Sequence, residues 1–443
     1  MTLGSWSIVQ PPSLIALIPL IIMIAMAIRG KNNISACFVG IVAGALIMGQ
    51  DVTKMAALFH KCMGSTTVLI GVIIMLGAGL GALMTECRVT HTLVFWIVKG
   101  IGVNTQTKGK IALMISSIMV CGLLGTMGGG NAVIAPIMIP ILGSLGVTPT
   151  VVATLMKLCG EIGLTMGPLT GVTLITMEVT GLSYGQLMVG AVLPFAFFFL
   201  GGAWFGVIRA QKRTEGKEAY EINEDVKSVS NFQATPRERN ATIAFLLTFI
   251  ALVIYGIITK QKTNYAVIVM IVLASVVAIM ARVEIDRAVK SMSKGIASQA
   301  PMMIMFIGFE MLLNLVSAGG GFKALADYLS SFAGDSPTMI MLVAAIVGGF
   351  GIEAAAVAEI KIIAEMFGAT AQAAGLPMSM FAISILAATR LTGSIYPTTN
   401  FAIAIGVAQC TNTKEVLQAC WIACASVCVF ILVWSVLGVR LLT

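Results

Sequence analysis

Apolar runs of about twenty residues recur along the whole chain and are separated by short polar turns. A helix needs about 20 apolar residues to cross roughly 30 Å of hydrocarbon, so each run is long enough for one membrane crossing. In the first half, the pattern predicts spans at Leu14–Ile28, Ile34–Met48, Thr66–Leu83 and Leu187–Ile208, and a short interfacial helix at His91–Val98. Residues 209–240 are too polar for a bilayer, and the apolar pattern begins again after them.

Two apolar segments in each half are interrupted by glycine, proline and polar residues. Backbone that breaks a helix inside lipid must be enclosed by protein or line a water-filled cavity. The glycine-rich centre of residues 111–145 therefore predicts a re-entrant hairpin, and residues 338–367 predict a second one. The glycines and prolines in 149–179 and 377–411 predict two broken helices.

The amino-acid sequence of the second half resembles that of the first at a nearly constant offset in residue number. Gly64 aligns with Gly295 and Gly77 with Gly308, and with small gaps Pro149 meets Pro377. We therefore predict two copies, residues 1–208 and 241–443, joined by a connector at 209–240. An odd number of crossings in each copy makes them inverted repeats. The predicted fold is an all-α polytopic membrane protein with about ten transmembrane helices, two re-entrant hairpins and two broken helices.

Composition agrees with a membrane protein and excludes other classes. Of the 443 residues, 58% are hydrophobic and only 10% are charged, against about 25% charged in soluble domains. The net charge of +8 does not indicate nucleic-acid binding, because the basic residues are scattered among the predicted loops. Their excess on the connector side predicts a cytoplasmic connector and external termini, as in a bacterial-type inner membrane.

No catalytic or metal-binding pattern stands out. The nine cysteines include no Cys-x-x-Cys pair and there are only two histidines, so we expect no metal, no cofactor and no enzyme activity. We also find no phosphate loop and no nucleophile with a base partner. Repeat-related broken helices favour a carrier over a channel.

Charged residues inside apolar segments are costly and need a reason. Lys157 and Glu161 are four apart and can form an internal ion pair, or Glu161 can serve the transport site. Arg390, in a cluster of polar groups that includes Thr398, can bind a substrate carboxylate or pair with Glu161. Lys361 and Glu365 share the four-residue spacing and predict an ion pair. Glu178 and Glu310 lie near predicted span ends and are expected to be solvated.

The two hairpin tips differ in charge. After Gly128, Gly129, Gly130 and Asn131 a helix is predicted to begin, and its first amides suit an anion. The second tip carries Glu353, which would attract Na⁺ or an amine, or bind a proton. A simpler interpretation is that the glycines only allow close helix packing.

Four motifs, Gly128–Asn131, Gly167–Gly171, Gly348–Glu353 and Ser394–Asn400, resemble those of the ion transporter superfamily. Within it the chain is most similar to NhaC-type Na⁺/H⁺ antiporters, gluconate-permease-like proteins and amino-acid or organic-acid permeases. The resemblance implies a homodimer with scaffold and transport domains and an elevator mechanism. It places substrate or ion contacts at Asn131, Thr170, Thr399 and Asn400, and Na⁺ near Gly128, Gly167 and Ser394.

Two functions remain open from the sequence. The first is a secondary active transporter that moves a small organic acid or amino acid together with H⁺ or Na⁺, with membrane lipid and a small-molecule substrate as its partners. The second is a Na⁺/H⁺ antiporter, in which Glu161 or Glu353 would exchange a proton for a cation. Every aspartate falls in a predicted loop, and this weakens the antiporter hypothesis.

Overall fold

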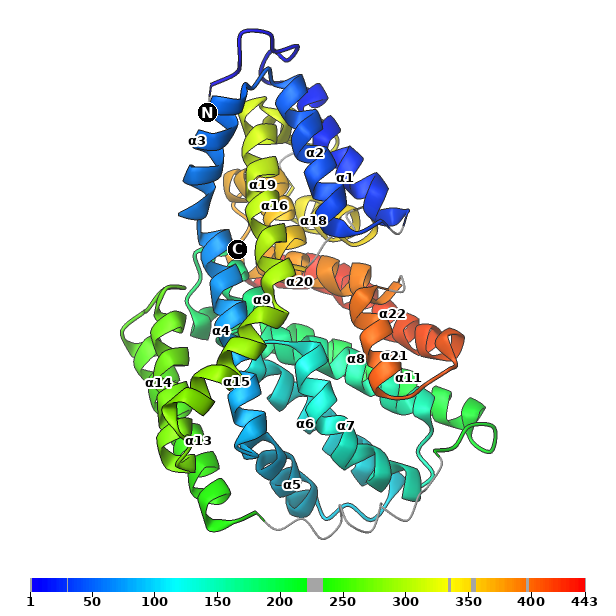
Figure 1. The fold of residues 1–443 in the computed structure, drawn as a ribbon. Helices are drawn as coiled ribbons and strands as arrows, with labels where there is room; N and C mark the ends of the chain where they lie inside the picture. Colours follow the sequence, from blue (N-terminus) through cyan, green and yellow to red (C-terminus); the bar gives the residue numbers. More distant parts are fainter. Residues whose placement is uncertain are drawn as a thin grey trace.

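A computed structural model describes residues 2–29, 31–220, 234–333, 336–351, 356–395 and 398–442 (Figure 1). Every regular element in these ranges is helical, which confirms the all-α prediction. Eight of the described helices are long and apolar enough to cross a membrane, or nine if one bent pair counts as a single span. The predicted class of polytopic membrane protein is therefore confirmed, with a number of long spans close to the ten expected.

Both predicted halves of the chain consist of successive helices in their described parts. Those of the first half are η1 (Leu14–Leu17), α1 (Ile18–Ile28), α2 (Asn33–Ile47), α3 (Val52–Met63), α4 (Thr66–Glu86), α5 (Val89–Ile101), α6 (Gln106–Leu124), α7 (Met127–Ser144), α8 (Pro149–Met166), α9 (Gly171–Thr180), α10 (Tyr184–Leu187), η2 (Met188–Val192) and α11 (Leu193–Thr214). Those of the second are α13 (Pro236–Ile258), α14 (Tyr265–Ala281), α15 (Ile285–Ser298), α16 (Ala300–Ala318), α17 (Gly321–Ala333), α18 (Pro337–Gly351), α19 (Ala356–Ala373), α20 (Met378–Ile395), α21 (Thr399–Val407) and α22 (Thr413–Leu442).

The interrupted segments form helix pairs with boundaries that differ from the predicted ones. Helix α6 begins at Gln106, five residues before the predicted hairpin, and α19 continues to Ala373, beyond the predicted end at 367. Helices α8 and α9 meet at an angle of 45°. Helix α11 extends to Thr214 and α13 starts at Pro236, so both helices run into the predicted connector, whose domain bounds stay a prediction. Re-entry of the hairpins stays a prediction, since α6 and α7 are each long enough to span.

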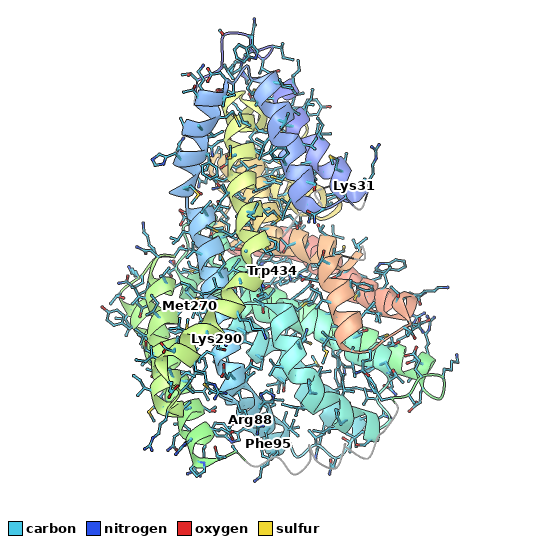
Figure 2. The ribbon with its side chains drawn as sticks, in the orientation of Figure 1. Lys31, Arg88, Phe95, Met270, Lys290 and Trp434 are labelled. Atoms are coloured by element: carbon cyan, nitrogen blue, oxygen red, sulfur yellow. The ribbon has the colours of Figure 1, made fainter. Side chains whose placement is uncertain are left out.

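Helices of each half pack against helices of the other half. Helix α19 packs on α9 while α21 packs on α7, and α16 packs on α2 while α14 packs on α4. Figure 1 shows the α1–α2 pair and the α13–α14 pair at opposite ends of the molecule. Side chains fill the space between the helices, with Met270 of α14 reaching α4 near Gly77 (Figure 2). The domain division and the inverted relation of the copies stay predictions.

Glycines set the closest helix contact around the first broken helix. A Cβ atom on Gly163 of α8 would lie 2.5 Å from the backbone oxygen of Ile118 on α6, and one on Gly167 would lie 2.3 Å from that of Gly122. Such distances leave no room for a methyl group. Glycines therefore permit close packing at the α6–α8 contact, where it fixes the start of the break.

We expect Gly163→Ala to destabilise the protein by about 1–3 kcal/mol, the usual range for overpacking, because α6 and α8 must move apart. The matched control is Gly201→Ala in α11, where a Cβ would meet nothing within 4 Å. Thermal unfolding in detergent measures both variants. A Gly163→Ala variant as stable as the control would contradict the packing argument.

Candidate functional site

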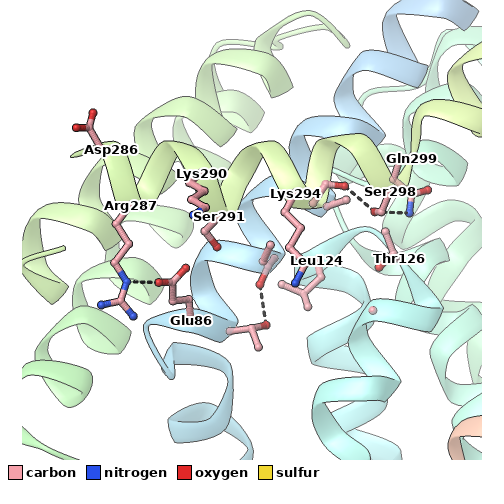
Figure 3. Close-up of a pocket in the computed structure, with 16 residues that line it drawn as sticks. Glu86, Leu124, Thr126, Asp286, Arg287, Lys290, Ser291, Lys294, Ser298 and Gln299 are labelled. Carbon is pink, nitrogen blue, oxygen red and sulfur yellow. Dashed lines mark hydrogen bonds and ion pairs between the residues drawn. The ribbon is translucent and has the colours of Figure 1, made fainter. Parts of the chain in front are cut away.

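A cavity of about 1200 Å³ opens between α4, α15 and the tip that joins α6 to α7 (Figure 3). Helix α4 contributes its last part, from Ala78 to Glu86, and the tip contributes Leu124, Thr126 and Gly129. Helix α15 and the turn after it supply most of the polar lining, namely Asp286, Arg287, Lys290, Ser291, Lys294, Ser298 and Gln299. The first hairpin tip thus faces a charged surface from the other half of the chain.

The charged surface follows from the pattern of α15. Arg287, Lys290 and Lys294 are three and four residues apart and so share one face of the helix. Next to Lys294, Gly295 is buried, and a Cβ there would lie 2.3 Å from the backbone oxygen of Ala78. The missing side chain allows α15 to lie directly on α4, which holds the three basic side chains along the cavity.

Basic residues outnumber acidic residues in the lining of the cavity. Arg287 hydrogen-bonds Glu86 across the α4–α15 contact, and this bond raises the pKa of the Arg287 guanidinium above its ordinary value. Figure 3 shows Lys294 extending from α15 toward Leu124. With Glu86 engaged by Arg287, the lysines Lys290 and Lys294 supply the positive charge available to a ligand.

The tip of the first hairpin adds amide groups to the same cavity. Helix α7 begins at Met127, and the side chain of its N-cap residue, Thr126, makes no capping hydrogen bond. The first amides of a helix have no partner within it and carry partial positive charge. Of the predicted tip residues, Gly129 lines the cavity.

The other predicted tip residues face the protein interior. Asn131 is fully buried, accepts a hydrogen bond from Ser117 at 2.7 Å and donates one to the Met156 carbonyl at 2.9 Å. A Cβ on Gly130 would meet Cys121, and one on Gly128 would meet Ile403. In this conformation Asn131 ties α6, α7 and α8 together, and its substrate contact stays a prediction.

Two basic side chains converge on one buried carboxylate between the broken helices. The Lys157 ammonium lies 2.8 Å from one Glu161 oxygen and donates to the Ser394 hydroxyl at 2.9 Å. Arg390 lies 3.6 Å from the other Glu161 oxygen. All three charged residues are at most 3% exposed. Of the alternatives that the sequence left open, the ion pairs are therefore observed, while a substrate contact by Glu161 or Arg390 stays a prediction.

Threonines cap the helices that follow the two breaks. Thr170 accepts from the Thr173 amide at the start of α9, and Thr398 accepts from the Phe401 amide at the start of α21. At the second break Thr399 is exposed and Asn400 half-buried. Glu353, predicted at the second tip, lies outside the described residues.

A second, partly buried ion pair joins α16 to the second hairpin. Glu310 lies 3.5 Å from Lys361, whose ammonium also donates to Thr67 of α4 at 3.2 Å. The predicted pair of Lys361 with Glu365 is wrong, because Lys361 reaches across to another helix instead. Glu310 is 7% exposed, so its predicted solvation is wrong too. Glu178 is exposed, as expected, and accepts a hydrogen bond from Thr66.

Sequence reasoning did not assign the three basic residues of α15 to a site. It counted Arg287, Lys290 and Lys294 only as loop charges, although the strongly amphipathic pattern of residues 285–298 was a usable signal. Their position depends on contact with the hairpin tip of the other half. Within the described ranges, no group of three or more His, Cys, Asp or Glu side chains is arranged to hold a metal ion.

The many apolar helices define a polytopic membrane protein with a charged cavity between them. Residues 15–439 match the family described as tripartite ATP-independent periplasmic transporter, DctM component, and the chain belongs to this family. It is therefore the membrane component of a secondary transporter of small organic substrates. The expected kinship with NhaC-type antiporters and gluconate permeases is wrong, since the family that matches nearly the whole chain is a different one.

Two solved structures are similar over most of their length. MtrF of Neisseria gonorrhoeae, from a class of antimetabolite efflux pumps, shares 13% identity over 86% of this chain and 83% of its own, with a TM-score of 0.49. The YdaH transporter of Alcanivorax borkumensis shares 15% identity over 87% of this chain and 88% of its own, with a TM-score of 0.48. None of the curated proteins matches this chain.

Proposed function

We propose that this chain moves a small organic anion through the cavity between α15 and the first hairpin, driven by a gradient of H⁺ or Na⁺. The observation that carries the proposal is the lining: Lys290 and Lys294 stand opposite the uncapped start of α7. Charge-assisted hydrogen bonds to such groups are roughly twice as strong as neutral ones. A carboxylate fits both sides of the cavity.

The transport cycle follows from the contacts of the cavity walls. One wall belongs to α4 and α15, which we assign to a scaffold, and the other to the first hairpin, which we assign to a moving transport domain. Sliding of the second against the first would carry the bound anion across the bilayer, the elevator motion expected from the sequence. The family description supports two further components beside this chain. The homodimer stays a prediction.

We expect Lys294→Gln to weaken binding of the transported carboxylate by about 10- to 100-fold, because a hydrogen bond to a charged group contributes about 1.5–3 kcal/mol. The measurement is equilibrium binding of a panel of radiolabelled small carboxylates to the purified chain, with the matching uncharged amides as competitors. Lys414→Gln is the matched control, an exposed lysine outside the cavity lining.

Two results would contradict this function. Equal loss of affinity in Lys414→Gln would show that overall charge, rather than the cavity, attracts the anion. Binding of the amides as tightly as of the carboxylates would remove the role of the lysines.

A further inference from the structure

Another buried acid, Glu359 on α19, lies among oxygen atoms rather than beside a cation. It is 1% exposed, and its carboxyl lies 2.8 Å from the hydroxyl of Thr392 on α20. Among the described residues no lysine or arginine lies within ion-pair distance of it, in contrast to Glu161, on which both Lys157 and Arg390 converge. An unpaired carboxylate buried in an apolar bundle is costly, and the structure has to offset that cost.

The hydrogen bonds available around Thr392 offset the cost of burying Glu359. Its hydroxyl oxygen lies 3.1 Å from the backbone oxygens of Gly349 and Ala388 and 3.3 Å from that of Gly348. A hydroxyl has one proton to donate, and backbone oxygens only accept. If Glu359 were ionised, this one proton would face four acceptors. If Glu359 carries a proton, it donates to Thr392, and Thr392 donates to one carbonyl, so both groups are satisfied.

Other charges near Glu359 come from several helices. Arg390 on α20 attracts a negative charge on Glu359, and Glu161 on α8 opposes it. Lys361 and Glu365 lie on α19 itself, and Lys361 pairs with Glu310 of α16. The remaining charged residues on helices packed against α19 have exposed side chains and are Glu178 on α9 and Lys323 and Asp327 on α17. Glu359 therefore has Arg390 as its alternative partner.

We propose that Glu359 binds the proton that drives transport, an inference that rests on the proposed function and names its coupling ion. With the proton bound, hydrogen bonds from Glu359 through Thr392 connect α19 and α20 to the Gly348–Gly349 end of α18. Release breaks the carboxyl O–H bond and passes the proton to water as hydronium. The carboxylate left behind turns to Arg390 and loosens the second hairpin from the broken helix. The 2.8 Å contact is a direct hydrogen bond, with no space for Na⁺ between the two oxygens.

The test compares Glu359→Gln with wild type and with Glu178→Gln, an exposed acid on α9. A glutamine amide can donate to Thr392 as the protonated acid does, but it cannot release a proton. We expect the variant to fold, to bind the carboxylate and to lose uptake driven by an imposed pH gradient, measured in cells that contain the complete transport system. Glu178→Gln should keep pH-driven uptake. Retention of pH-driven uptake by Glu359→Gln, or a cycle driven by Na⁺ alone, would overturn the proposal.

Infrared difference spectroscopy on the purified chain tests the site independently of transport. Wild type should show the C=O band of a protonated carboxyl at neutral pH, and Glu359→Gln should lack it; an unchanged band would overturn the assignment. Should Glu359→Gln not fold, Thr392→Val removes the hydrogen-bond partner and should shift the band, and an unshifted band counts equally against the proposal. Failure of carboxylate binding in wild type would reject the proposed function while the band still decides the proton site.

Discussion

Glu161→Gln is expected to destabilise the folded protein by about 3–5 kcal/mol, the usual effect of breaking a buried ion pair, and to abolish transport. The variant leaves Lys157 and Arg390 buried without their shared counter-charge, on helices α8 and α20. The Lys157 ammonium, which donates to Ser394 next to the second break, would also no longer be held in place by the Glu161 carboxylate. Thermal unfolding in detergent measures the loss, with transport assayed on correctly inserted protein.

Two further variants separate this effect from a general loss of polar contacts. Lys157→Met keeps the Glu161–Arg390 pair, so it should destabilise the protein clearly less than Glu161→Gln. Glu415→Gln breaks the half-exposed contact with Arg213 and should change stability by less than about 1 kcal/mol. If Lys157→Met were as damaging as Glu161→Gln, charge balance would not be what stabilises the cluster.

The sequence predicted what depends on local spacing. Runs of apolar residues gave most helices, and the four-residue spacing of Lys157 and Glu161 gave their ion pair. The pairing of Arg390 with Glu161 could be raised only as one alternative, because it depends on how α8 and α20 cross. The same spacing predicted a pair of Lys361 with Glu365 that does not form, since the long lysine side chain reaches Glu310 on a neighbouring helix instead.

The site was harder to predict than the fold. Gly129 was selected as a tip residue and does line the cavity, but the lysines that face it come from α15, in the other half of the chain. Asn131 was selected for the same reason as Gly129, yet two residues further along α7 its side chain faces the interior. The side of the helix on which a tip residue lies therefore decides whether it contacts a ligand or packs in the interior. A glycine-rich sequence does not determine which residues lie on which side.

The cavity and the Glu310–Lys361 pair lie toward opposite ends of α4. The cavity is lined by its last part, up to Glu86, whereas Lys361 donates to Thr67 near its start. On the proposed function, and with the second hairpin assigned to the transport domain like the first, this domain is thus open at one end of α4 and tied to the scaffold at the other. The ion pair would have to break whenever the protein opens at the Thr67 end.

Glu310→Gln should therefore increase access at that end. We expect a cysteine introduced by Thr66→Cys to react with a water-soluble maleimide about tenfold faster, if the pair contributes about 1.4 kcal/mol to the closed state. Rates are taken relative to the chain without the new cysteine, whose own nine thiols are all buried or half-buried. Glu86→Gln, which breaks a pair within the scaffold, should leave the rate unchanged, and the swap Glu310→Lys with Lys361→Glu should restore it. An unaltered rate in Glu310→Gln would mean that the pair only stabilises the fold, because a contact that holds one state closed must change that state's population when it is removed.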